Sequence, residues 1–304
     1  MEFLPYEIES NIKEYVIFKP KTKEELKTAV DLWCIDKEEA LNKYGHISNW
    51  NTSLIIDMSY LFYNKKNFND NINNWDISSV IKTNNMFHGA ELFNQRLDLW
   101  DTSSVTNMNG MFFEASSFNQ PLNSWDVSSV NNMAQIFIYA SSFNQPLNKW
   151  DVSSVIVMGG MFCRASSFNQ PLNSWDVSSV LNMCNMFHRA SSFNQPLNSW
   201  DVSSVLYMDS IFGEASKFNQ NINSWNVSSV SIMSNMFNEA SSFNQPLDLW
   251  NVSAVTNMHG MFNKASSFNQ SLNAWDVSSV TEMEHIFDNA VSLDTNNAQW
   301  YDFD

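Results

Sequence analysis

Acidic side chains recur in this sequence every 25 residues, each directly after a tryptophan, and this spacing could serve metal chemistry. The carboxylates of the column are Asp76, Asp101, Asp126, Asp151, Asp176, Asp201 and Asp276. If consecutive units stack at the spacing of neighbouring β-strands, about 5 Å, adjacent carboxylates repel each other, and a calcium ion bound between them would relieve that repulsion. The first six carboxylates therefore form a hypothetical calcium ladder.

The same column also contains asparagine, at Asn51, Asn226 and Asn251. Asparagine keeps the oxygen acceptor but loses the charge, so a calcium ladder would be interrupted at these units. Both residue types can instead accept a hydrogen bond from the backbone near the following serine, which is the Asx-type turn. We favour this structural interpretation and expect no metal site.

Amide side chains form a second column with the same period. Asn recurs at 69, 94, 119, 144, 169, 194, 219, 244 and 269, and from Asn94 onward each is followed by Gln. Amides stacked at strand spacing bond to their neighbours. The pattern predicts structural ladders, although a regular amide face could also match a repetitive ligand such as a glycan.

Residues suited to catalysis are sparse. The five histidines are scattered, and Cys34, Cys163 and Cys184 lie outside the repeat register with neither zinc spacing nor a disulfide framework. No Ser-His-Asp set, His-Glu-x-x-His motif or glycine-rich phosphate loop is present. We expect free thiols, no cofactor and no enzymatic activity, and a metal-dependent enzyme is the least supported alternative.

The repeat that positions these columns is marked by tryptophan. Trp occurs at 50, 75, 100, 125, 150, 175, 200, 225, 250, 275 and 300, and only Trp33 falls outside this series. No interval contains an insertion or deletion, so every unit must occupy the same space as its neighbours. Such regularity predicts a stacked array of ten repeats over 50–300.

Two periods coexist within one unit. Leu122, Trp125 and Val127 end in an alternation typical of a short strand. The apolar residues that follow have helical spacing and are Val130, Met133, Ile136, Phe137 and Ala140. With Ser128 as N-cap, each 25-residue repeat is predicted to contain one short parallel strand and one short helix, which makes the fold class α/β.

The chain ends differ from the repeats. Thr22 with Glu25 and Asp36 with Glu39 form two capping boxes, and Gly45 is a stop signal, so two short helices should form an N-terminal cap over 22–49. The remaining segments are a leader over 1–21 and a tail over 301–304. The repeat pattern decays after Leu293, as a C-terminal cap requires.

The motif Leu122-x-x-Trp125-x-Val127-x-x-Val130-x-x-Met133, together with Ser-Phe-Asn-Gln-Pro-Leu-Asn-x-Trp-Asp-Val-Ser-Ser-Val as at 117–130, resembles the BspA-like leucine-rich-repeat surface proteins. That family includes the mycoplasma lipoprotein repeat of unknown function, and its members occur in bacteria, protists and giant viruses. The resemblance covers about 22–300. It implies a right-handed leucine-rich-repeat-like solenoid and a role as adhesin or interaction protein rather than enzyme.

Two neighbouring columns change freely between the repeats, and we predict that both lie on the outward side of the helices. The candidate interaction face consists of Phe113, Glu114, Ile138, Tyr139, Arg164, His188, Arg189, Glu214, Glu239 and Lys264. Because the Asp and Ser columns hardly vary, specific recognition is expected here, in the loops or at the N-terminal cap.

Composition limits the partners. The chain has 32 acidic and 16 basic residues, a formal net charge of −16, so its field repels phosphate backbones and we expect no nucleic acid partner. The sequence has no run of 18 apolar residues, so no membrane insertion is expected. The start Met1-Glu2-Phe3-Leu4 lacks a signal-peptide pattern, which favours a cytoplasmic or virion-associated location unless export uses a non-Sec route.

These features predict a non-enzymatic interaction or surface module that binds protein or carbohydrate partners in adhesion or host interaction. The alternative is a purely structural scaffold or virion-associated protein. The exposed repeat columns could also serve self-association.

Overall fold

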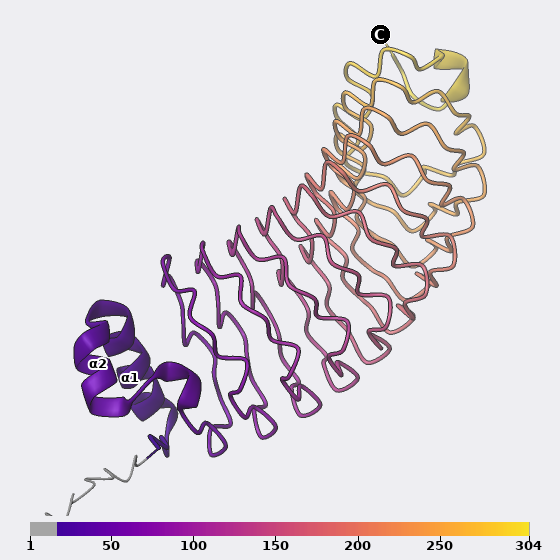
Figure 1. Ribbon diagram of the computed structural model, residues 1–304. Coiled ribbons are helices and arrows are strands. Elements are labelled where there is room, and N and C mark those ends of the chain that lie inside the picture. The colour runs from indigo at the N-terminus through magenta and orange to yellow at the C-terminus, as the bar shows by residue number, and fades with distance from the viewer. Residues whose placement is uncertain (1–16, 304) are drawn as a thin grey trace, which may run out of the picture.

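The computed structural model of this chain describes residues 17–303, which form a curved stack of coils with two helices at its N-terminal end (Figure 1). The elements are α1 (Lys23–Ile35), α2 (Lys37–Tyr44) and two short 3₁₀ helices, η1 (Ile47–Asn49) and η2 (Thr295–Asn297). Each coil runs from one repeat tryptophan to the next, and we number the coils 1 to 10 from Trp50. Most of the predicted leader, residues 1–16, lies outside the described residues.

The two N-terminal helices begin at the predicted caps. The Thr22 hydroxyl accepts the Glu25 N–H at 3.2 Å, and the Asp36 carboxylate accepts the Glu39 N–H at 2.9 Å. The Glu25 carboxylate accepts from the Lys21 N–H at 2.7 Å, one residue before the expected partner. These caps satisfy amides that a helix start leaves unpaired. The buried side of α1 includes Trp33, whose ring centroid lies 5.9 Å from that of Trp50, so α1 closes the end of the coil stack.

The predicted α/β leucine-rich-repeat-like solenoid is wrong. In residues 17–303 neither a strand nor an α-helix occurs beyond α2, and the segment 130–140, expected to be helical, consists of tight turns. The cause is the backbone at Gln135 (φ 63°) and Tyr139 (φ 57°), because both lie in the left-handed region. The same two positions have positive φ in every coil. A right-handed helix cannot continue through such residues.

The predicted strand is also replaced by turns. The Trp125 N–H bonds back to the Leu122 carbonyl at 3.1 Å, and the Val130 N–H bonds back to the Val127 carbonyl at 2.9 Å. Each bond closes a turn where the strand was expected. The alternation at Leu122, Trp125 and Val127 therefore reflects corners of a coil that point their apolar side chains inward.

Backbone hydrogen bonds hold consecutive coils together. The amides of Met133, Gln135 and Phe137 donate to carbonyls of the next coil at 2.9–3.0 Å, each 24 residues further on. One isolated parallel bridge joins each pair of neighbours, for example Asn132 with Val157. The expected parallel register of 25 residues is present, although no strand extends beyond a single bridge.

The interior is filled by ladders of equivalent side chains from consecutive coils. Phe137 stacks on Phe162 with ring centroids 5.6 Å apart, and Phe143 stacks on Phe168 at 6.0 Å. The Trp125 indole N–H donates to the Leu97 carbonyl at 2.9 Å, so its one polar atom is satisfied inside the core. Methionines recur at two positions of the unit, such as Met108 and Met111, and these two are buried as well. Because a single coil cannot bury its apolar side alone, the fold depends on stacking.

Candidate interaction surface

The two variable columns lie at one tight turn of every coil and not on helices, which corrects the predicted placement. In coil 4 the Ile138 N–H bonds back to the Gln135 carbonyl at 3.3 Å, and Tyr139 follows with φ 57°. The corresponding residues with the same left-handed backbone are Glu114, Arg164, Arg189, Glu214, Glu239 and Lys264. All the predicted face residues are half-buried or exposed. We call this row of turn residues the variable strip.

The backbone under the strip is uniform even though the side chains differ. The Arg164 N–H donates to the His188 carbonyl at 2.7 Å, and the Arg189 N–H donates to the Gly213 carbonyl at 2.8 Å. The same bond recurs between the other inner coils. These backbone hydrogen bonds therefore form whatever side chain the strip position carries.

Aromatic rings form the N-terminal part of the strip. The ring centroids are 4.8 Å apart for Tyr63 and His88, 4.3 Å for His88 and Phe113, and 6.3 Å for Phe113 and Tyr139. The Arg164 guanidinium lies over the Tyr139 ring at 4.7 Å. Tyr63 and His88 were not predicted, yet they occupy the same column, two units and one unit before Phe113 respectively. The side chain of Glu114 lies close enough for its charge to act on His88.

Charged residues meet in the middle of the strip. The Arg189 Nε donates to Glu214 Oε2 at 2.6 Å, and the His188 Nε2 lies 3.7 Å from Glu214 Oε1. Burial lowers the pKa of His188. Burial also opposes ionisation of Glu214, but the hydrogen bond and charge of Arg189 hold the pKa of Glu214 below its ordinary value. At neutral pH Glu214 is therefore ionised and His188 is neutral.

The remaining predicted residues lie in other coils of the same strip. Lys264 Nζ pairs with Glu239 Oε1 at 2.6 Å between coils 8 and 9. Ile138 lies against Gly160, where an added Cβ would come within 3.1 Å of Ile138 Cδ1. The predicted face is thus brought together as contacts between neighbouring coils rather than as one compact patch.

The aspartate column forms the predicted Asx-type turns. Asp126 Oδ1 accepts the Ser128 N–H at 3.0 Å and the Ser128 hydroxyl at 2.6 Å, and these bonds lower the pKa of Asp126. Asn226 makes the same pair of bonds to Ser228, at 3.2 and 2.8 Å. Within the part of the chain that the structure describes, no three His, Cys, Asp or Glu side chains converge as a metal site would require.

The amide column is structural, as predicted. Asn119 Oδ1 accepts two bonds from the next coil, the Asn144 N–H at 2.9 Å and the Gln145 Nε2 at 3.1 Å. The inner coils repeat this arrangement. Each Asn side chain therefore ties two coils together.

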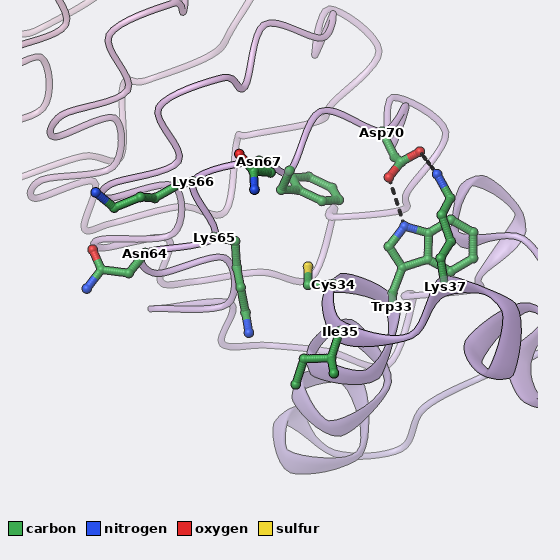
Figure 2. A pocket seen from close by; sticks show the side chains of 10 residues that line it. Trp33, Cys34, Ile35, Lys37, Asn64, Lys65, Lys66, Asn67 and Asp70 are labelled. Carbon is green, nitrogen blue, oxygen red and sulfur yellow. Dashed lines mark hydrogen bonds and ion pairs between the residues drawn. The ribbon is translucent and has the colours of Figure 1, made fainter.

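A pocket of about 530 Å³, which sequence reasoning missed, lies between the end of α1 and coil 1 (Figure 2). Its lining residues are Trp33, Cys34, Ile35, Lys37, Asn64, Lys65, Lys66, Asn67, Phe68 and Asp70. Figure 2 shows Asp70 accepting from both the Trp33 indole N–H, at 2.9 Å, and the Lys37 ammonium, at 2.6 Å. A signal that sequence reasoning could have used was Lys65, which stands where the later units have alanine.

The two other lysines of this pocket are also paired. Lys65 pairs with Asp31 at 2.7 Å, and Lys66 pairs with Glu91 at 2.8 Å. Desolvation by the surrounding protein raises the pKa of Cys34 to about 11, so the thiol stays protonated at neutral pH. The three cysteines carry no disulfide.

Comparison with known proteins assigns the repeats to a family. The profile of a Mycoplasma protein of unknown function, DUF285, matches residues 34–147, 115–225, 139–250 and 196–300. A comparison with curated proteins gave no match. In residues 17–303, no helix has both the length and the apolar character needed to cross a membrane.

Proposed function

The chain belongs to the DUF285 family of repeat proteins, whose function is unknown, and on this basis we propose that it is a non-enzymatic module that binds a macromolecular partner through the variable strip. The observation that carries this proposal is that the backbone of the strip is the same in every coil whereas its side chains differ. Arg164 and Glu239 occupy the same turn site in different coils, with the same left-handed backbone. The shared backbone does not require either residue type at this site, whereas recognition of a specific partner would favour such variety.

The composition of the strip supports a protein partner more than a carbohydrate. Tyr139 and Arg164 are residue types enriched at protein interfaces, and Tyr139 is 40% exposed. The alternation of Glu114, Arg164 and Glu239 along the array offers a charge pattern that one partner can match and others cannot. A role in adhesion extends the proposal and rests only on the resemblance to BspA-like surface proteins.

The test is partner binding by a charge-reversed strip. We expect the double variant Arg164→Glu and Arg189→Glu to lose at least tenfold in affinity for a partner isolated from the source cells or particles. The matched control is Lys149→Glu with Lys217→Glu, which changes the net charge equally at exposed positions outside the strip. Equal losses in both double variants, with unchanged thermal unfolding midpoints, would refute the strip as the binding surface.

A purely structural role is the second candidate. The Phe62 column continues as an unbroken series of stacked rings to Phe287, with neighbouring centroids 5.3–5.8 Å apart, which favours a stiff spacer. Cofractionation with particles or envelopes that is insensitive to the strip variants would support this candidate instead.

A further inference from the structure

A second exposed surface lies away from the variable strip, in coils 5 to 7. Ile156, Leu181 and Leu206 occupy the same position in three consecutive coils and are 44%, 41% and 37% exposed. The Leu181 N–H bonds to the Ile156 carbonyl at 2.9 Å, and the Leu206 N–H bonds to the Leu181 carbonyl at 3.0 Å. The three side chains therefore form a continuous line along the array, which we call the apolar ridge.

A row of carboxylates runs beside this ridge. Asp151 and Ile156 flank one tight turn, closed by the Val155 N–H bonding to the Val152 carbonyl at 2.9 Å. The same turn recurs in coils 6 and 7. The acidic row therefore consists of Asp151, Asp176 and Asp201, all exposed, next to Ile156, Leu181 and Leu206.

The ridge and the acidic row end at the same coil boundary. Coil 8 has Asn226 and Ser231 in the two positions, and coil 9 has Asn251 and Thr256. Stacking does not require the apolar side chains, because the Ser231 N–H bonds to the Leu206 carbonyl at 3.0 Å just as in the ridge. On the other side, coil 4 keeps the acid but has Asn131 in the ridge position. Exposed Ile56 and Ile81 recur only in coils 1 and 2, separated from the ridge by two polar coils.

The spacing of the ridge fits a helix better than an extended segment. Three coils at about 4.8 Å per step span about 10 Å. A helix that presents apolar residues at i, i+3 or i+4, and i+7 covers about 10 Å with the same number of contacts. An extended strand places same-face side chains about 6.6 Å apart and loses register with the ridge.

The acidic charge of the chain favours a basic helix as the partner. The net charge of −16 repels acidic partners and a second copy of this chain. Carboxylates along one flank of the ridge attract lysine or arginine on the matching flank of a docked helix. We infer that the apolar ridge and the acidic row together bind the apolar face of a basic amphipathic helix of a partner protein. This inference is independent of the variable strip, and the small footprint indicates a weak, transient complex.

The experiment titrates the full chain into a fluorescein-labelled, 18-residue peptide of Leu, Ala and Lys and follows fluorescence polarisation. The peptide places its leucines on one helical face with lysines along one flank. We expect Leu181→Ser to weaken binding at least tenfold, and the triple variant Asp151→Asn, Asp176→Asn and Asp201→Asn to weaken it at least fivefold. Because asparagine already stands in this column at Asn226, the triple variant keeps the local turn.

Matched controls separate the site from general charge and hydrophobicity. The triple variant Asp76→Asn, Asp101→Asn and Asp126→Asn changes the same column in coils 2 to 4, and Leu249→Ser removes a leucine that is 71% exposed elsewhere. Both controls, and the strip variant Arg164→Glu with Arg189→Glu, should bind the peptide as the unmodified chain does. Ile156→Ser provides a second ridge variant if Leu181→Ser lowers the unfolding midpoint.

Three results would overturn the inference. Equal binding of a shuffled peptide of the same composition would show that the binding is due to net charge alone. Tighter binding of an alternating Leu-Lys peptide would assign the ridge to an extended partner. Concentration-dependent dimerisation in sedimentation, abolished by Leu181→Ser, would assign the ridge to a second copy of the chain.

Discussion

The His188 imidazole lies over the α-carbon of Gly213 in the next coil, so that a Cβ added at Gly213 would come within 2.9 Å of His188 Nδ1 and 3.3 Å of the Asn235 carbonyl oxygen. Glycine at this strip position therefore makes room for the histidine ring. We expect Gly213→Ala to lower the free energy of unfolding by about 1–2 kcal/mol, the usual cost of overpacking. Chemical denaturation followed by tryptophan fluorescence measures the loss.

The double variant Gly213→Ala with His188→Ala identifies the contact that causes this loss. Removing the ring frees the space that the new methyl group needs, so the second substitution should recover most of the stability. Simple additivity of the two single effects would show that the strain arises at the Asn235 carbonyl instead.

At Gln135, where the backbone is left-handed, we expect a glycine substitution to stabilise the fold. Gln135 has φ 63°, and Gly110 and Gly160 stand in the same column at 60° and 66°. Since an L-residue pays about 1 kcal/mol or more for this conformation, Gln135→Gly should raise the unfolding midpoint. Ala134→Gly, one residue earlier and without positive φ, should lower the free energy of unfolding by about 0.5–1 kcal/mol. Destabilisation by both substitutions would contradict the left-handed assignment.

The repeat length, the parallel register and the apolar core could be predicted because they depend on residue spacing alone. The helix could not, because Val130, Met133, Ile136, Phe137 and Ala140 face the core equally well from a chain of turns. The overlooked signal is the Gln135 column, where six of ten residues are Gly or Asn, at Asn85, Gly110, Gly160, Asn185, Asn235 and Gly260. Those residue types tolerate positive φ and oppose a helix in these six units.

The candidate site was predicted only in part for a similar reason. Variation between units located the strip at Arg164 and its equivalents without any knowledge of the backbone. The contacts within it, such as that of Arg164 with Tyr139, depend on the geometry of the turns, which could not be derived while a helix was predicted there. The pocket at Lys65 depends on how α1 meets coil 1, and no repeat pattern contains that relationship.

The amide ladder should be important for stability. Asn119 Oδ1 accepts both the Asn144 N–H and the Gln145 Nε2, so Asn119→Ala leaves two donors without their partner. We expect a loss of about 1–3 kcal/mol in the free energy of unfolding. Ser129→Ala, at an exposed position in the next coil, is the control and should change stability by less than about 0.5 kcal/mol. A loss no larger than that of the control would exclude a stabilising role for the ladder.

The aspartate column should not respond to calcium. In coils 2 to 6 one oxygen of each carboxylate accepts both the N–H and the hydroxyl of its own serine, as Asp151 does with Ser153 at 3.1 and 2.6 Å. We expect calorimetric titration with calcium to give no binding heat and the unfolding midpoint to be the same with calcium or with a chelator. A midpoint raised by calcium and lost in Asp151→Asn with Asp176→Asn would establish the calcium ladder.

The same serine bonds predict a pH dependence of stability. The hydrogen bonds from the Ser128 hydroxyl and N–H lower the pKa of Asp126 below the ordinary value of 3.8. A group whose pKa is lower in the folded state stabilises the fold above its unfolded pKa, and this contribution disappears as pH falls through the folded pKa. Asp126→Asn keeps both bonds, as Asn226 does, but cannot titrate. We therefore expect this variant to match the unmodified chain at pH 7 and to lose less stability between pH 5 and pH 2. Identical pH profiles in denaturant unfolding would show that the turn does not distinguish the charged from the neutral carboxyl group.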